Sequence, residues 1–343
     1  MNQESKTNAK GKKPLSRRQF ITRAATMAGL TAGMGYLSFA PEDYLFSLKD
    51  KTGLRSLPKP EVYTLQDFSI KPDNSFPDVG IGRQGETGVI LRKALDAIGG
   101  LERFIKPGDV VLVKPNAAFD RSPNLGATTH PEIIFELVQM LFKDCRAAEV
   151  KVADNPIESP ADCFEKSGIK RAVEDAGARV YLPDGNAFQN LHTPDAVLIK
   201  NWSFFHRPFR NVTKVIGIAP VKDHNLSGAS LGIKNWYGLL GGKRNQFHQD
   251  IHEIISDLAI MIRPTLTILD GTRVLMRNGP TGGIPSDVEM KQTVIAGTDP
   301  VAIDAWAVIN LLERGRDLPE YLMKSELKGA GKIDPSGRIR EVI

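Results

Sequence analysis

Cysteine is scarce in this chain of 343 residues, which contains only Cys145 and Cys163. The two lie 18 positions apart and neither belongs to a CxxC pair. The chain therefore cannot build an iron–sulfur or zinc centre from its own thiolates, nor a disulfide scaffold. In an oxidising compartment the two residues would form a single disulfide, and otherwise they would be buried thiols.

Several nucleotide-binding and catalytic motifs are also missing. There is no P-loop and no GxSxG elbow, and His248 and His252 lack the glutamate of an HExxH zinc site. Residues 80–85 match GxGxxG by spelling. However, no strand is expected to lead into them, and the next strand ends in Lys114 rather than in an acidic residue. A dinucleotide fingerprint is therefore not expected.

Excess positive charge is confined to one end of the chain. The formal net charge is +5, while 41% hydrophobic and 25% charged residues are typical of a globular protein of one or two domains. Residues 1–40 hold seven of the 45 basic residues and one of the 40 acidic residues, so 38 basic and 39 acidic residues follow them. This near-neutral remainder argues against a nucleic-acid partner.

The basic N-terminus has the parts of an export signal. Arg17 and Arg18 follow Ser16 and precede Phe20, and a mild apolar run extends to Ala40. The pattern resembles a twin-arginine signal peptide over residues 1–40, which implies the translocation machinery as a partner and the periplasm as the location. The alternative is a surface arginine pair before an ordinary helix.

The fate of this signal is open at the sequence level. Residues 38–40 have the small side chains that a signal peptidase prefers, but Pro41 follows directly and hinders cleavage after Ala40. An uncleaved tether to the inner membrane is therefore the alternative to a released protein.

Short apolar runs alternate with helical patterns after a proline-containing linker and N-terminal extension over residues 41–87, which holds one edge strand near residues 62–65. This alternation predicts a three-layer α/β domain over residues 88–343, with a mostly parallel sheet between two layers of helices. Helices are expected at residues 88–104, 131–143, 160–176, 251–262 and 300–312. Strands are expected at residues 109–113, 149–153, 178–182, 196–199, 212–218, 266–269 and 292–296.

Polar side chains follow several of these strands. Because ligands bind beyond the carboxyl ends of parallel strands, we expect these side chains to form the rim of one pocket. Each alone is also explained as a turn or helix cap. The residues are Lys114, Asn116, Asp154, Asn155, Lys222, His224, Asp270, Thr298 and Asp299.

The stretch from residue 219 to residue 249 adds the densest group of chemically useful side chains, and such long, glycine-rich connections are commonly functional. The alternative is a solvated loop. We expect Lys234, His224 and His248 to be catalytic, with the histidines as general acid or base near neutral pH. Asp154 and Asp270 are the candidate ligands of a divalent metal. Binding of an anionic ligand is expected from Lys114, Asn116, Lys222, Asn235 and Arg244.

Ten short motifs occur in an order that resembles the domain-of-unknown-function family 362 over about residues 88–312. They begin at residues 113–116 (VKPN), 129–131 (THP) and Asp154, and continue through 222–224 (KDH), 231–235 (LGIKN), Arg244 with 247–248 (FH), and 257–258 (DL). They end with 270–271 (DG), 278–280 (NGP) and 297–304 (GTDPVAID). The resemblance implies an α/β fold. Some members carry ferredoxin-type iron–sulfur modules or occur among anaerobic redox proteins, but this chain lacks such cysteine modules.

Two functions remain in view from the sequence. The first is an exported enzyme that acts on a small anionic substrate or cofactor, with Asp304, Asp154 and Asp270 orienting the basic groups or binding a metal. The second is a non-catalytic periplasmic factor that binds a ligand or another exported redox protein during its maturation. A purely structural role explains the lysine and histidine residues at the strand ends least well.

Overall fold

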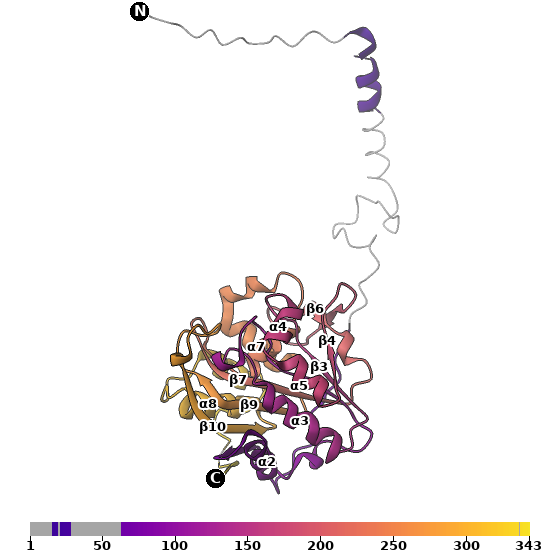
Figure 1. Cartoon of the computed structure of the whole chain (residues 1–343). Helices are drawn as coiled ribbons and strands as arrows, with labels where there is room; N and C mark the ends of the chain where they lie inside the picture. The colour runs from indigo at the N-terminus through magenta and orange to yellow at the C-terminus, as the bar shows by residue number, and fades with distance from the viewer. Residues whose placement is uncertain (1–15, 20, 29–62, 336) are drawn as a thin grey trace, which may run out of the picture. The chain divides into compact units, whose positions relative to one another are not determined.

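The computed structural model describes residues 16–19, 21–28, 63–335 and 337–343 (Figure 1). By its internal contacts the chain divides into residues 1–61 and residues 62–343. In the first unit, the described residues from Arg17 to Ala28 are helical and exposed. Ser16 Oγ accepts from the Gln19 N–H (3.3 Å) and Gln19 Oε1 from the Ser16 N–H (3.1 Å), a reciprocal capping box at the helix start.

The arginine pair therefore lies on the first turn of a capped helix. Phe20 and the apolar run beyond residue 28 lie outside the described residues, as does the proposed cleavage position after Ala40. Among the helices that the structure describes, none combines the length and the apolar character needed to cross a membrane.

The second unit is built on a mixed, mostly parallel sheet of nine strands in its described residues. Strands β9, β7, β2, β3 and β4 run parallel, β10 is antiparallel to β9 and β1, and the short β8 pairs with the end of β7. From edge to edge the order is β11 (Ile339–Val342), β1 (Val79–Arg83), β10 (Val288–Gly297), β9 (Leu266–Leu275), β7 (Lys214–His224), β2 (Val110–Lys114), β3 (Glu149–Ala153) and β4 (Arg179–Tyr181), with β8 spanning Gly228–Ser230.

Helices cover both faces of this sheet (Figure 1). Successive strand residues point to opposite faces, so Val111 and Val113 join one buried cluster while Leu112 joins the other. The first cluster contains residues of α2 (Thr87–Ala97), α3 (Pro131–Lys143), α4 (Pro160–Lys166) and α5 (Ile169–Asp175). The second contains residues of α7 (Ile251–Met261), α8 (Pro300–Asn310) and α9 (Glu320–Leu327). The predicted α/β class is confirmed.

Several expected elements differ from the observed ones. The helix expected at residues 160–176 is divided at Gly168, whose φ of 74° is left-handed. The strand expected at residues 196–199 is absent, and a hairpin of β5 (Phe188–His192) and β6 (Asn201–Phe205) flanks that turn instead. Near residues 62–65 the described residues contain a single bridge, between Tyr63 and Leu191.

The GxGxxG match has a packing explanation. It lies mostly on β1, inside the segment expected to be a linker and extension, and β1 pairs with β10 in the main sheet. A Cβ atom at Gly80 would lie 2.2 Å from the Ala94 carbonyl oxygen, and one at Gly82 would lie 2.1 Å from that of Ile90. These glycines therefore let α2 pack closely on the strand.

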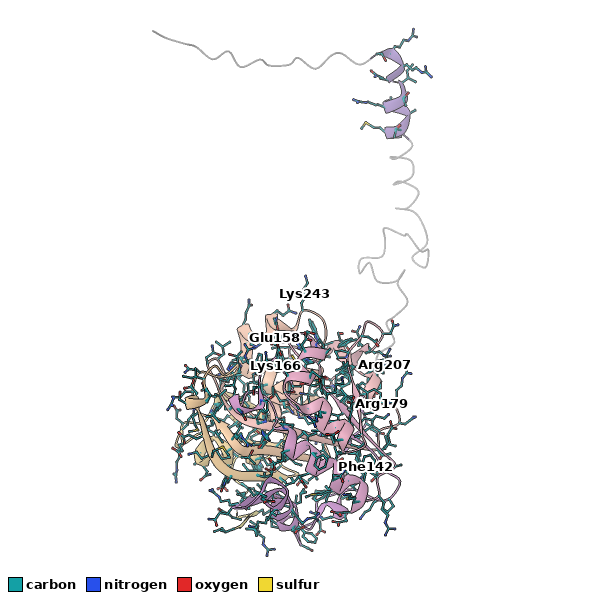
Figure 2. The ribbon with its side chains drawn as sticks, in the orientation of Figure 1. Phe142, Glu158, Lys166, Arg179, Arg207 and Lys243 are labelled. Atoms are coloured by element: carbon teal, nitrogen blue, oxygen red, sulfur yellow. The ribbon has the colours of Figure 1, made fainter. Side chains whose placement is uncertain are left out.

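Charged side chains such as Lys166, Arg179 and Lys243 are exposed at the surface (Figure 2). The two cysteines are instead buried and unbridged, and burial raises the pKa of each thiol to about 12. Of the two possibilities left open by the sequence, a disulfide or two buried thiols, the structure has the two buried thiols.

Candidate functional site

The candidate site lies where the chain order in the sheet reverses. From β2 the chain proceeds outward through α3 to β3, whereas β7, on the other side of β2, proceeds through α7 to β9. Helices α3 and α7 contribute to the clusters on opposite faces. A crevice is expected beyond the carboxyl ends of two strands related in this way.

A pocket of about 90 Å³ occupies this position, and we call it the strand-end pocket. It unites side chains that were predicted separately from three strand ends and from the long connection after β7. The predicted residues that line it are Lys114, Asn116, Asp154, Asn155, Lys222, His224, Lys234, Asn235, Arg244 and His248.

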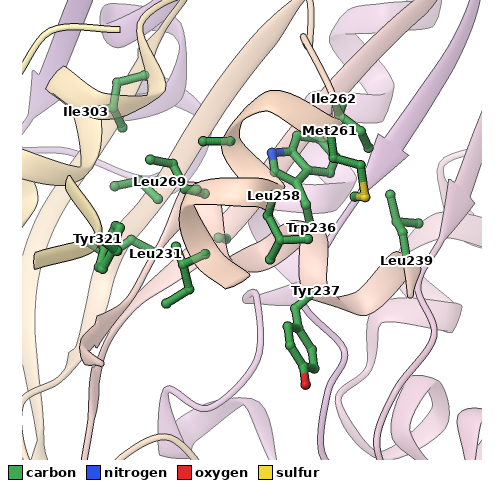
Figure 3. Close-up of a cluster of buried hydrophobic side chains, with 14 of the residues drawn as sticks. Leu231, Trp236, Tyr237, Leu239, Leu258, Met261, Ile262, Leu269, Ile303 and Tyr321 are labelled. Carbon is green, nitrogen blue, oxygen red and sulfur yellow. The ribbon is translucent and has the colours of Figure 1, made fainter. Parts of the chain in front are cut away.

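The connection after β8 is folded, not a solvated loop. It forms α6 (Gly232–Asn235) and the 3₁₀ helices η4 (Trp236–Leu239) and η5 (Arg244–Asp250). The carboxylate of Asp304 on α8 accepts the N–H groups of Gly232 (2.9 Å) and Ile233 (3.1 Å), which fixes the start of α6. In Figure 3, Trp236 packs among core side chains such as Leu258, while the ring of Tyr237, which belongs to the same buried cluster, points away from Trp236.

The floor of the pocket is an ion pair. Lys114 and Asp154 are each 1% exposed and lie 2.7 Å apart. The Lys114 ammonium also donates to the Pro115 carbonyl (2.8 Å) and to Asn235 Oδ1 (2.7 Å), so its three N–H bonds all have acceptors. Burial lowers the pKa of Lys114 and Asp154 opposes that shift. Lys114 therefore has a structural role in the pocket, because none of its N–H bonds is left for a ligand.

Close approach of the backbone completes the floor. A Cβ atom at Gly238 would lie 2.0 Å from Asp154 Oδ1 and 2.6 Å from Lys114 Nζ. The Gly238 carbonyl also accepts the Asn155 N–H at 2.8 Å. Glycine is therefore required where η4 crosses the ion pair.

Arg244 is similarly engaged. Its guanidinium donates to four backbone carbonyls, those of Tyr237 (3.2 Å), Leu240 (3.0 Å), Asn155 (2.8 Å) and Pro156 (2.7 Å). Only one of its five N–H donors is left. The geometry therefore supports the predicted anion-binding role of Arg244 less than a structural role, in which Arg244 links η4 to the segment that follows β3.

Two other lysines have no carboxylate bonded to them among the described residues. Lys222 is 1% exposed and donates to the Ala127 carbonyl (2.6 Å) and to Asn116 Oδ1 (3.3 Å), with its ammonium 5.1 Å from the centre of the Phe119 ring. Its pKa lies well below the ordinary value, first because of burial and then because of Lys234 and Lys114.

Lys234 on α6 is the less constrained of the two. Its ammonium lies 5.4 Å from the centre of the Tyr237 ring, and within the described part of the chain it makes no hydrogen bond. Burial, followed by repulsion from Arg244 and Lys114, lowers its pKa to about 8. It is a half-buried cation in the pocket wall whose donors are open to a ligand.

His224 is a fixed donor. Its Nδ1 accepts the N–H groups of Leu226 (3.2 Å) and Ser227 (3.3 Å), which assigns the proton to Nε2. Burial and then the charges of Lys234 and Lys222 lower its pKa to about 2. The predicted acid–base role near neutral pH therefore does not suit His224, whereas hydrogen-bond donation from a neutral ring does.

His248 has the opposite tautomer. Its Nδ1 lies 3.1 Å from the Asn245 carbonyl and 3.3 Å from the Tyr237 hydroxyl, whose own proton goes to the Arg244 carbonyl at 2.5 Å. The Nδ1 atom therefore carries the proton and the Nε2 lone pair is available. Burial lowers the pKa of His248, so the ring is a neutral base at neutral pH.

Asp270 does not reach the pocket. Its carboxylate accepts the His130 N–H (2.9 Å) and both the N–H (3.1 Å) and the hydroxyl (2.6 Å) of Thr272. Residues 16–19, 21–28, 63–335 and 337–343 contain no group of three or more His, Cys, Asp or Glu side chains placed to hold a metal ion. The geometry therefore does not bring Asp154 and Asp270 together as metal ligands.

Thr298 and Asp299 were wrongly placed at the pocket rim. They follow β10, which is antiparallel to β9, so they lie at the opposite edge of the sheet. Asp299 Oδ1 accepts the Val301 (3.0 Å) and Ala302 (2.9 Å) N–H groups and caps α8.

Some residues of the pocket were not predicted as site residues. Phe119 and Ile157 come from irregular segments after β2 and β3, and Pro280 comes from the turn between β9 and β10. Phe119 and Ile157 carry no sequence signal beyond following a strand with polar residues at its end, whereas Pro280 belongs to the NGP motif at residues 278–280.

A known family model covers all the residues that line the strand-end pocket. Residues 111–309, more than half of the chain, match the family described as Domain of unknown function (DUF362). The chain belongs to this family. A thylakoid-associated protein of Synechocystis sp. is 28% identical in an alignment of 231 positions that covers 62% of this chain and 66% of that protein. The DUF362 chain thus spans just under two thirds of this relative's length.

Two solved structures align with the chain at low scores. A lactate racemase apoprotein from Thermoanaerobacterium thermosaccharolyticum gives a TM-score of 0.37 at 12% identity, covering 76% of this chain and 58% of the racemase. A Thermotoga maritima protein gives 0.33 at 14% identity, covering 67% of this chain and 56% of its own. The chain spans little more than half of each. Scores this low establish no shared chemistry.

Proposed function

We propose that the strand-end pocket binds a small anionic ligand and that His248 exchanges a proton with it. The observation that carries this proposal is Lys234, a half-buried ammonium with no hydrogen-bonded partner in the described residues. A cation that is partly withdrawn from water without a counter-charge is costly, and an anion in the pocket would offset that cost. The neutral Nε2–H of His224 supplies a second donor, and the His248 Nε2 lone pair supplies the base.

The arrangement suits an enzyme as well as a binding protein. Donors that already point into a pocket need no reorganisation when negative charge develops on a ligand. A neutral histidine with a free lone pair beside them is a competent general base. These features support proton transfer to or from a bound anion as the chemistry of the pocket.

Native mass spectrometry of the protein purified from its own host tests the binding proposal. We expect the wild-type protein to retain a small ligand that the variant Lys234→Met loses, and that the exposed control Lys243→Met keeps. If none of the three proteins carries a ligand, and neither phosphate nor acetate raises the melting temperature of the wild type, the proposal is wrong.

We also propose that the chain is exported to the periplasm by the twin-arginine pathway. The support is the pair Arg17 and Arg18 directly after a capping serine, in a basic segment that differs in charge from the near-neutral remainder. Replacing both arginines with lysine keeps the charge and should retain the protein in the cytoplasm on fractionation. The control Arg23→Lys should leave the protein in the periplasm. Equal periplasmic yield from all three would contradict export by this pathway.

A further inference from the structure

The size of the strand-end pocket restricts what it can hold. One water-sized group needs about 10–15 Å³ of such space, so a pocket of about 90 Å³ accepts about six to nine non-hydrogen atoms. A nucleotide or a flavin has too many atoms to fit within this volume, whereas an inorganic anion such as phosphate leaves part of it unfilled. Volume alone therefore favours a ligand of intermediate size.

The lining of the pocket combines polar and apolar side chains. Lys222 (1% exposed) and His224 (3% exposed) belong to its buried side. Phe119, Ile157 and Pro280 belong to its outer side, where Ile157 is 45% exposed and the other two are half-buried. Two polar donors of the lining are thus buried, whereas Lys234 is half-buried, as Phe119 and Pro280 are. Phe119, Ile157 and Pro280 form the apolar rim of the pocket.

Three separate loops fix this apolar rim. The Ile157 N–H donates to the Ala118 carbonyl at 3.1 Å, which ties two of the loops together. Pro280 is placed by its neighbour Gly279, whose N–H donates to Asp223 Oδ2 at 2.9 Å. A Cβ atom at Gly279 would lie 1.9 Å from the Asp223 carbonyl oxygen, so this loop packs directly on the end of β7. These contacts hold in place the loops that carry Ile157 and Pro280.

Small-molecule sites commonly combine apolar walls with a few polar groups that set the orientation of the ligand. An inorganic anion would gain nothing from Phe119 and Ile157. A fully apolar ligand would leave Lys234 without a counter-charge.

We propose that the ligand is a small organic acid of about six to nine non-hydrogen atoms. Its carboxylate lies against Lys234 and His224 Nε2, and its hydrocarbon part lies against Phe119, Ile157 and Pro280. This inference rests on the proposed function of the same pocket and adds the class of ligand.

Calorimetric titration of the full chain with acetate, phosphate, hexanoate and adenosine monophosphate tests this inference. Hexanoate has four more methylene groups than acetate, and burying only two of them should make it bind at least about tenfold more tightly. Ile157→Ala should weaken hexanoate binding several-fold more than acetate binding and so reduce this preference. The control Val197→Ala, which removes a 66% exposed side chain away from the pocket, should change neither.

The outcomes separate the two proposals. If acetate or phosphate binds in a manner that requires Lys234 but hexanoate gains nothing, the organic-acid inference is wrong and the anion pocket stands. Tight binding of adenosine monophosphate, or equal weakening of every anion by Ile157→Ala, would also overturn the inference. If none of the anions binds, both proposals fall.

Discussion

Lys234→Met should stabilise the unliganded protein. The pKa of Lys234 falls from its ordinary 10.5 to about 8 in the folded protein, chiefly through burial. The folded state therefore holds this proton less well than the unfolded chain, which costs about 3 kcal/mol of folding stability at pH 7. Methionine has a similar length and carries no charge, so the variant is relieved of this cost.

The sign of the pH dependence follows from the same shift. Because the folded-state pKa is the lower one, the wild type gains stability as pH rises from 8 towards 10.5. The cost of Lys234 falls to about 2 kcal/mol at pH 9 and to below about 1 kcal/mol at pH 10. Methionine also loses the contact with the Tyr237 ring, worth about 1 kcal/mol. The net gain is thus about 2 kcal/mol at pH 7 and near zero at pH 10.

Urea denaturation followed by tryptophan fluorescence, in a buffer without phosphate or carboxylates, measures this difference at both pH values. Lys243→Met is the matched control, because Lys243 is an exposed lysine on the same connection (Figure 2). It should change stability by less than about 0.5 kcal/mol. A variant Lys234→Met that is less stable than the wild type at pH 7, or a gain that does not shrink by pH 10, would refute the reasoning.

Three further predictions concern the same pocket. Binding of acetate should weaken about tenfold from pH 7 to pH 9 in calorimetry, because Lys234, with a pKa of about 8, loses its charge in that interval. Gly238→Ala should lower the free energy of unfolding, measured in urea, by at least about 3 kcal/mol, because its Cβ atom would separate Asp154 from Lys114. Gly283→Ala should not lower it, because a Cβ atom at Gly283 would lie in open space. Asp304→Ala should lower the free energy of unfolding in urea by about 2 kcal/mol, because the buried N–H groups of Gly232 and Ile233 lose their acceptor. It should also weaken acetate binding, because these bonds fix the start of the helix that carries Lys234.

Much of the fold could be predicted because apolar spacing is a local signal. The limits of α3 and β3 were predicted to the residue, since Pro131 and the apolar runs mark them clearly. The hairpin of β5 and β6 was missed because its strands contain Asn190 and Asn201 among apolar residues, which weakens the alternation. β1 was missed because its two glycines read as a loop, although they serve contact with α2.

The grouping of side chains around the strand-end pocket could be predicted because parallel strands bring their carboxyl ends to one edge of a sheet. That rule collected Lys114, Asp154 and Lys222 correctly. It failed for Asp299, because only the structure reveals that β10 runs antiparallel to β9. It failed for Asp270 because Thr272, two residues on, offers that carboxylate local donors.

The roles of the cations could not be read from the chain, because they depend on partners that are distant in sequence. Lys114 and Lys234 are the same residue type, the first at the end of β2 and the second on α6. Lys114 meets Asp154, 40 positions away, and Asn235, and its donors are used up. Lys234 sits on a helix fixed by Asp304, and no carboxylate among the described residues bonds to its ammonium. A frame in which Lys114 and Arg244 are bonded within the protein while the Lys234 ammonium stays open is what a site needs if an anion is to complete it.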